Sequence, residues 1–327
     1  MKMVFTNNSL DFLCLDVFPP GVNTLAFSDS HVFRTITSLI CVVNGILSPS
    51  IVVVNLMVFV AILRKPRLRT ASNTSILCLA TTDLIVGLLA QPAFVVFQAS
   101  KLRGNLNTVP CFEILIARFL EIFCIGYSFL TLNLMTVERY LAVFHPFWYH
   151  EKVTSKGIIL SSFMCWTIWT ALFLGVRLTL GINSHEELII TSGTVAATLI
   201  LTSLVYYKIF KLARSSVNAV DFSNADIQKK LRETKAARTV VIVTGTVFLC
   251  CCPTCVSLLL DRLNAVDKAV IYHAIYPIAE SVVFLNSILN SMIYVWRCAE
   301  IRNSMKEALN KLRRKQSLAA SESVKAS

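Results

Sequence analysis

One acidic residue, Asp83, lies midway along a strongly apolar stretch of the sequence. Amide and hydroxyl side chains occur at similar depths in other apolar stretches: Asn55, Ser128, Asn286, Ser287 and Asn290. A buried carboxylate surrounded by such oxygens is the environment that a small hard cation prefers. The spacing therefore predicts a cation site at Asp83. A purely structural role, in which Asp83 only hydrogen-bonds to neighbouring helices, is the alternative.

A second charged group, Glu138-Arg139, stands at the end of an apolar stretch and is followed by Tyr140. A charge at the centre of a membrane costs roughly 2.5 to 3.5 kcal/mol on insertion scales, so charges in apolar stretches mark functional positions. We therefore expect a functional ion pair here. A simple interfacial charge pair is the alternative.

Two further acids, Glu121 and Glu280, occur in apolar stretches on the side opposite Arg139. Paired carboxylates in a medium of low dielectric constant attract a cation strongly, which predicts a positively charged ligand, an amine or a basic peptide. Aromatic residues that could line the same cavity are Phe123, Tyr272, Tyr276 and Phe284. The alternative is that Glu121 pairs internally, with Arg118 or Arg177.

The elements that must position these residues are seven apolar stretches in a chain of 327 residues that is 55% hydrophobic and 15% charged. They cover residues 39–63, 72–99, 112–137, 157–178, 188–210, 238–260 and 269–296. A bilayer-spanning helix needs about 20 mostly apolar residues. The sequence therefore predicts an all-α membrane protein, a seven-transmembrane helix bundle.

The net charge of +12 reflects topology and not nucleic-acid binding, because 23 of the 31 Lys and Arg residues fall on one side of the seven stretches. Cytoplasmic segments carry such an excess, which predicts an extracellular amino terminus and a multi-pass protein of the plasma membrane. The predicted divisions are an extracellular segment, the bundle, an amphipathic helix and a cytoplasmic tail: 1–38, 39–298, 299–314 and 315–327.

Several positions are candidates for covalent modification. Cys14 and Cys111 are the cysteines expected on the oxidising side, so they could pair, and Asn7 begins a glycosylation motif there. The amphipathic helix 299–314 suits the membrane surface and its lipids, and Cys298 before it is a candidate for palmitoylation. A free thiol is the alternative for Cys298.

Read in order, the motifs over residues 39–310 resemble those of rhodopsin-like G-protein-coupled receptors. The residues that carry this resemblance are Asn55, Leu79–Asp83, Glu138-Arg139-Tyr140, Trp166, Tyr206, Cys250–Pro253 and Asn290–Tyr294. Each motif is weak alone, but their order and their placement on the expected helices are specific.

The resemblance implies a role for each group. It implies a sodium pocket formed by Asp83, Ser128, Asn286, Ser287 and Asn290. It also implies that Arg139 is a switch, held by Glu138 and Glu233 until helix six moves outward and admits a heterotrimeric G protein. Tyr206 and Tyr294 would then turn inward. Glu121 occupies the position of the amine-binding aspartate of aminergic receptors, and the serine-containing tail would recruit arrestin after phosphorylation.

Four departures from the family pattern stand out. Cys251 replaces the toggle tryptophan, although Pro253 remains and should kink helix six, and Ser291 replaces the helix-seven proline. Helix five has no proline, its usual place being Thr198, and the short loop 179–187 has no cysteine for the usual disulfide. The last two departures resemble the branch of melanocortin, cannabinoid and lysophospholipid receptors.

The sequence thus predicts a receptor for an extracellular ligand and not an enzyme, since it contains no HExxH motif and no nucleophile–base pair at one depth. Other readings remain open. They are a receptor of the same fold with a lipid ligand, a receptor-like protein with constitutive or lost signalling, and a small-solute transporter. A transporter would need internal repeats or half-helices, and the sequence has neither.

Overall fold

The computed structural model describes residues 30–103, 111–180, 193–194, 196–198, 200–205, 207–209, 211, 224–307 and 310. At 111–115, 118, 125, 176–180 and 224–240 it describes the backbone alone. Within these parts of the chain, six helices are long and apolar enough to cross a membrane, and a shorter apolar helix covers Ala196–Ile209. The protein is therefore an all-α bundle of seven helices, as the sequence predicts.

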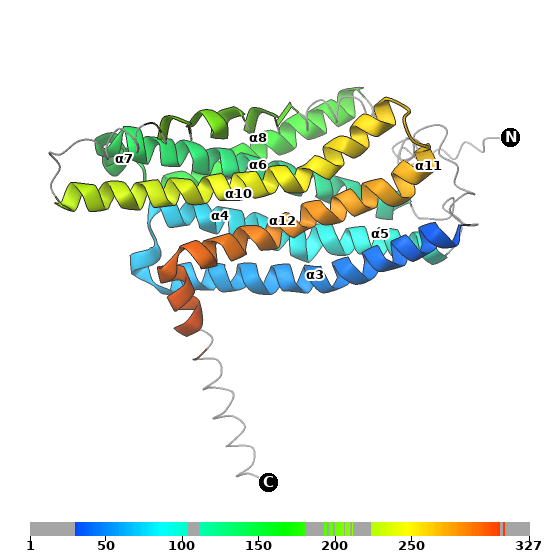
Figure 1. Ribbon diagram of the computed structural model, residues 1–327, viewed down its shortest axis with the longest axis horizontal. Coiled ribbons are helices and arrows are strands. Elements are labelled where there is room, and N and C mark those ends of the chain that lie inside the picture. Colours follow the sequence, from blue (N-terminus) through cyan, green and yellow to red (C-terminus); the bar gives the residue numbers. More distant parts are fainter. Residues whose placement is uncertain are drawn as a thin grey trace, which may run out of the picture.

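The spans follow one another along the chain and lie side by side (Figure 1). The first and third are the single helices α3 (His31–Arg64) and α6 (Cys111–Phe144). The fourth and sixth are α8 (Ser155–Leu180) and α10 (Asn224–Arg262). A short helix, α7 (Pro146–Lys152), connects the third span to the fourth.

The second and seventh spans each contain a π-helical segment. The second consists of α4 (Ala71–Ile85), η2 (Val86–Ala90) and α5 (Gln91–Arg103). The seventh consists of α11 (Lys268–Val270), η4 (Ile271–Ile275) and α12 (Tyr276–Arg297).

Proline explains where these π segments occur, because Pro92 and Pro277 lie two residues after η2 and η4. Proline has no N–H to donate, so the preceding turn cannot keep the regular pattern of hydrogen bonds. Pro253 lies inside α10, and Figure 1 shows that this helix bends towards its carboxyl-terminal end. The predicted kink of helix six therefore has a visible counterpart.

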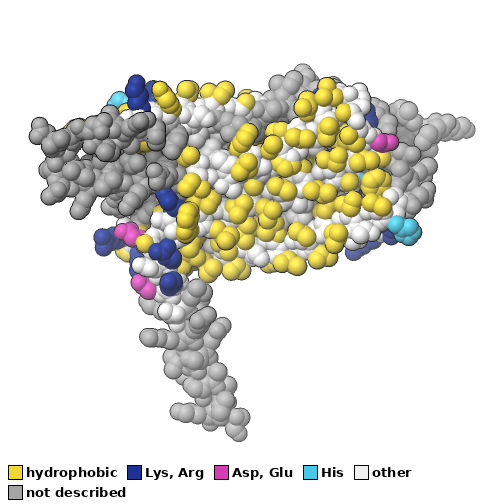
Figure 2. Space-filling view, in the orientation of Figure 1, with side chains coloured by type: hydrophobic (Ala, Val, Ile, Leu, Met, Phe, Trp, Pro, Cys, Tyr) yellow, Lys and Arg dark blue, Asp and Glu magenta, His cyan; other side chains and the backbone are white. Residues whose placement is uncertain are grey.

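The surface of the bundle fits a bilayer. In Figure 2 hydrophobic side chains cover its middle, while Lys and Arg gather towards the two ends. Many large apolar side chains face outward, including Ile46 at 67% and Leu249 at 70% exposure. Helices satisfy their own backbone groups, which is why they can present such surfaces to lipid.

A short helix at 299–307 follows α12 and turns away from the bundle (Figure 1). Ile301 and Met305, two apolar residues of the predicted amphipathic helix, are buried in the main hydrophobic cluster. Ser304 Oγ donates to the Ala61 carbonyl oxygen at 3.0 Å, and Lys65 pairs with Glu307 at 2.8 Å. This helix is thus docked on the end of α3.

Candidate functional site

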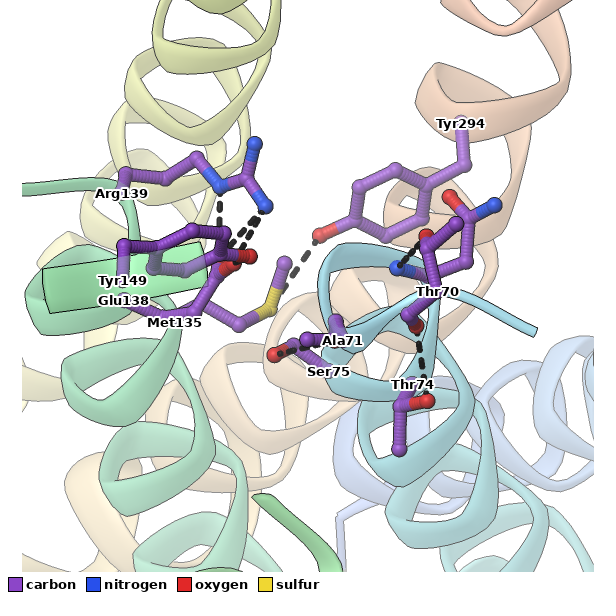
Figure 3. Close-up of polar contacts among 10 residues, drawn as sticks. Thr70, Ala71, Thr74, Ser75, Met135, Glu138, Arg139, Tyr149 and Tyr294 are labelled. Atoms are coloured by element: carbon purple, nitrogen blue, oxygen red, sulfur yellow. Dashed lines mark hydrogen bonds and ion pairs between the residues drawn. The ribbon is translucent and has the colours of Figure 1, made fainter. Parts of the chain in front are cut away.

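The Glu138–Arg139 pair is buried at one end of α6. Arg139 Nε and Nη2 donate to Glu138 Oε2 and Oε1 at 2.6 and 2.7 Å, and the residues are 6% and 2% exposed. The Tyr149 hydroxyl, from α7, donates to Glu138 Oε1 (Figure 3). Two charges at this depth are stable only when they are paired and hydrogen-bonded.

Tyr294 of α12 lies close to this pair and already points into the bundle. Its side chain is 2% exposed, and its hydroxyl donates to Met135 Sδ at 3.7 Å (Figure 3). Met135 lies one helical turn before Arg139 on α6. Tyr294, Met135 and Cys251 belong to one hydrophobic cluster, which therefore links helices α6, α10 and α12 next to the ion pair.

Asp83 lies on α4, is 1% exposed and faces α12. Its Oδ2 accepts from Asn290 Nδ2 at 3.3 Å, and the Ser287 hydroxyl is close by. The other members of the predicted cation site, Ser128 and Asn286, are also buried, at 9% and 6% exposure. The structure thus brings Asp83, Ser287 and Asn290 together.

The oxygen atoms of the predicted cation site are of a type that a small cation accepts. Asp83 Oδ1, Asn286 Oδ1 and Asn290 Oδ1 are buried, and each lacks a hydrogen-bond partner among the described residues. A buried acceptor without a partner costs about 1–3 kcal/mol, so an ion or ordered water would satisfy such atoms. One carboxylate oxygen and two amide oxygens are hard donors of the kind that sodium accepts.

Asn55, at a similar depth on α3, is not turned into this site. Its Nδ2 donates to the Ile51 and Ser287 carbonyl oxygens at 2.9 and 3.2 Å. Its Oδ1 accepts from Ser291 Oγ at 2.6 Å. The serine that replaces the family's proline therefore joins helix α12 to α3, and Asn55 has a structural role.

The two outer acids are buried, but two of the aromatic residues expected to line one cavity with them lie in different hydrophobic clusters. Glu121 and Glu280 are 8% and 4% exposed, and both have interaction partners in this structure. Phe284 packs edge-on against Phe94 at 5.4 Å within an apolar cluster. Phe123 instead packs against residues of α8, so it does not share the surroundings of Phe284.

A buried base in the same part of the bundle was not predicted from the sequence. Lys101 lies beyond residue 99, where we expected the second span to end. However, α5 continues to Arg103, and Lys101 is only 1% exposed. It interacts electrostatically with His273 of η4, which is fully buried. Helical spacing from Gln91 and Gln98, which are buried on the same helix, was the signal that could have revealed it.

Tyr149, which donates to Glu138, was also not predicted from the sequence. It lies eleven positions after Glu138 and returns to it only because α7 folds back beneath α6. No local sequence pattern predicts such a contact.

The Thr198 side chain, at the position of the absent helix-five proline, accepts a hydrogen bond from Asn133 Nδ2 of α6 at 3.0 Å.

Several predicted positions lie outside the described residues. Asn7, Cys14 and Tyr206 fall there entirely, while Cys111 and Glu233 are described by their backbone alone. Cys298 is partly buried against the main hydrophobic cluster. The predicted modifications and the Glu233 contact to Arg139 therefore stay predictions, as does the inward turn of Tyr206.

Comparison with known proteins agrees with this geometry. Residues 54–187 and 177–294 match the 7 transmembrane receptor (rhodopsin family). The chain is 29% identical over 280 residues to the human histamine H2 receptor, covering 78% of this chain and 75% of that protein. It is 25% identical over 292 residues to trace amine-associated receptor 1 of Macaca mulatta, covering 78% and 82%.

These relatives do not confirm the resemblance to the melanocortin, cannabinoid and lysophospholipid branch. The family match spans most of the bundle and includes the ion pair of α6, the Asp83 site and the Tyr294 contact. The chain therefore belongs to the rhodopsin family of seven-transmembrane receptors.

Proposed function

We propose that this protein is a plasma-membrane receptor, with an extracellular amino terminus, that activates a heterotrimeric G protein. The observation that carries the proposal is the buried Glu138–Arg139 pair, with both hydrogen bonds under 2.8 Å. Breaking a buried pair by removing one partner costs about 3–5 kcal/mol. Such a pair can therefore bias the bundle strongly towards one of two arrangements.

The two arrangements differ in the position of helix α10. In the closed arrangement Arg139 is held by Glu138, which also accepts from Tyr149. Outward movement of α10 about the bend near Pro253 would remove the predicted contact of Glu233 with Arg139 and open a cleft for the G protein. Ligand and G protein then bias the same equilibrium from opposite sides of the membrane.

For the extracellular ligand we propose a cationic amine held by Glu121. Two observations support this class of ligand: the burial of Glu121 and Glu280, and the similarity to receptors named for histamine and trace amines. A buried carboxylate attracts an ammonium group more strongly than an exposed one, because the local dielectric constant is low. Phe94 and Phe284 would supply an apolar floor.

The test is a panel of biogenic amines, histamine included, applied to cells that express the receptor with a promiscuous G protein. An amine that activates the wild type should lose affinity in Glu121→Gln. Unchanged affinity for the amine in this variant would refute the proposal that Glu121 binds the ligand. Activation by uncharged lipids alone would favour the lipid-receptor alternative.

We also propose an allosteric sodium ion at Asp83. It is supported by three buried oxygens, of Asp83, Asn286 and Asn290, that have no hydrogen-bond partner in the part of the chain that the structure describes. These residues would hold the ion, and its charge would stabilise the ionised carboxylate in the closed bundle.

A receptor with constitutive or lost signalling is the second candidate. It is favoured by Cys251, a small residue at the toggle position that packs within the central cluster. Nucleotide exchange without any agonist, abolished by Arg139→Ala, would indicate constitutive activity. Exchange that no amine, peptide or lipid stimulates would indicate lost signalling.

A further inference from the structure

Helix α10 carries an open apolar pocket of about 210 Å³ in its carboxyl-terminal half. The described residues that line it are Phe248, Cys251, Cys252, Cys255, Val256 and Leu259. They recur at intervals of three and four residues, so they form one face of the helix. All of them lie within the span Val241–Arg262, where the surrounding medium is lipid.

The rim of this pocket faces the bilayer, and its floor faces the protein. Cys252 and Cys255 are exposed and Leu259 is 57% exposed, whereas Cys251 is 7% exposed. The described lining consists of aliphatic, aromatic and thiol groups, and none of these six side chains is charged. We therefore expect an occupant that leaves the bilayer for this pocket to be uncharged, because these groups would not solvate a charge.

The size of the pocket is sufficient for a small ring. An apolar cavity of about 150 Å³ in another protein binds benzene, and this pocket is larger. The side chain at the floor of the pocket is small, because Cys251 occupies the position where the family resemblance leads us to expect a tryptophan. The space next to the bend at Pro253 is therefore a consequence of this chain's own sequence.

We propose that this pocket binds a small, uncharged lipophilic molecule that enters from the bilayer and acts on helix six. Cys251 connects the two events, because it lines the pocket and also packs in the cluster that contains Met135 and Tyr294. Occupancy of the pocket would change the packing at the bend of α10 and around Met135 and Tyr294, which lie beside the ion pair. Binding does not depend on the proposed receptor function, whereas the effect on signalling does.

The binding test uses toluene as the probe and Cys252 as the reporter thiol, in full-length protein in lipid nanodiscs. Benzyl methanethiosulfonate modifies membrane-facing thiols, and mass spectrometry follows Cys252 and the partly buried Cys165 of α8. Toluene should slow modification of Cys252 saturably, by about tenfold at about nine times its Kd, because only the empty fraction reacts. Modification of Cys165 should not change.

Filling the pocket gives the control. Cys255→Phe should abolish protection of Cys252, while Leu249→Phe, on a membrane-facing residue outside the lining, should retain it. Leu259→Phe replaces Cys255→Phe if the latter fails to fold. Equal slowing at Cys252 and Cys165, or saturable protection that persists in the filled variant, would overturn the site.

The signalling test adds toluene to the same nanodiscs with G protein and measures nucleotide exchange. A saturable change that disappears in Cys255→Phe supports the coupling to helix six. Protection of Cys252 without any change in measurable exchange would refute the coupling and retain the site. Absence of exchange under every condition would refute the receptor proposal, and the thiol assay would still report on binding.

Discussion

Replacing Glu138 by glutamine removes the charge from the buried ion pair while preserving the shape of the side chain. Glutamine keeps one acceptor oxygen for Arg139, so one charge-assisted hydrogen bond is lost out of the two at 2.6 and 2.7 Å. A hydrogen bond to a charged group contributes about 1.5–3 kcal/mol. Since about 1.4 kcal/mol is a factor of ten, the closed arrangement should lose about tenfold to a hundredfold in preference.

This shift should be visible as agonist-independent activity. If the open arrangement has a population of about 1% in the wild type, Glu138→Gln should raise it to between about 10% and 50%. The assay is nucleotide exchange on purified G protein in nanodiscs at equal receptor amounts. Melting of the variant at a lower temperature should accompany the change, because Arg139 remains buried with a weaker partner.

Glu151→Gln is the matched control. Glu151 pairs with Lys152 at 2.9 Å in the same part of the protein, but both side chains are more than half exposed. Exposed pairs contribute about 0–1 kcal/mol, so basal exchange should be unchanged. Equal basal exchange by wild type, Glu138→Gln and Glu151→Gln would refute the idea that the ion pair holds the closed arrangement.

Three further predictions concern the rest of the bundle. Sodium chloride, compared with choline chloride, should raise the melting temperature of the wild type and not that of Asp83→Asn, and equal shifts would argue against a sodium site. Gly126→Ala should lower the melting temperature by the equivalent of about 1–3 kcal/mol, because the new Cβ would lie 2.1 Å from the Trp169 ring. Gly45→Ala should leave the melting temperature unchanged, because among the described residues no atom outside its own helix lies within 4 Å of the new Cβ. Ser291→Ala should lower the free energy of unfolding by about 1–3 kcal/mol, because the side-chain amide oxygen on α3 that accepts from Ser291 Oγ at 2.6 Å loses its donor. An unchanged midpoint of chemical denaturation would show that this contact is unimportant.

Much of the fold could be predicted because the bilayer imposes a single length and composition on every span. The boundaries of the individual helices could not be predicted in this way. The first helix begins at His31, before the apolar run starting at 39, and α5 continues past the expected end at 99 to Arg103. Helices extend beyond the hydrocarbon region when caps such as Ser30 satisfy their first N–H groups.

The candidate site was predicted best where depth alone brings residues together. Asp83 and Asn290 meet because they lie at equal depths on adjacent helices. Asn55 shares that depth but faces Ser291, since depth does not determine which way a side chain points. The Tyr149 contact depends on how α7 folds back, which is a tertiary feature without a periodic signal.

In the proposed mechanism, Arg139 at the end of α6 transmits the state of the bundle to a G protein. This role can be measured by nucleotide exchange on each class of Gα subunit, with wild type and Arg139→Ala reconstituted in equal amounts. At least one heterotrimer should respond to the wild type, or to Glu138→Gln, and Arg139→Ala should abolish the response. Equal exchange with and without the arginine, or no response from any heterotrimer, would contradict this role.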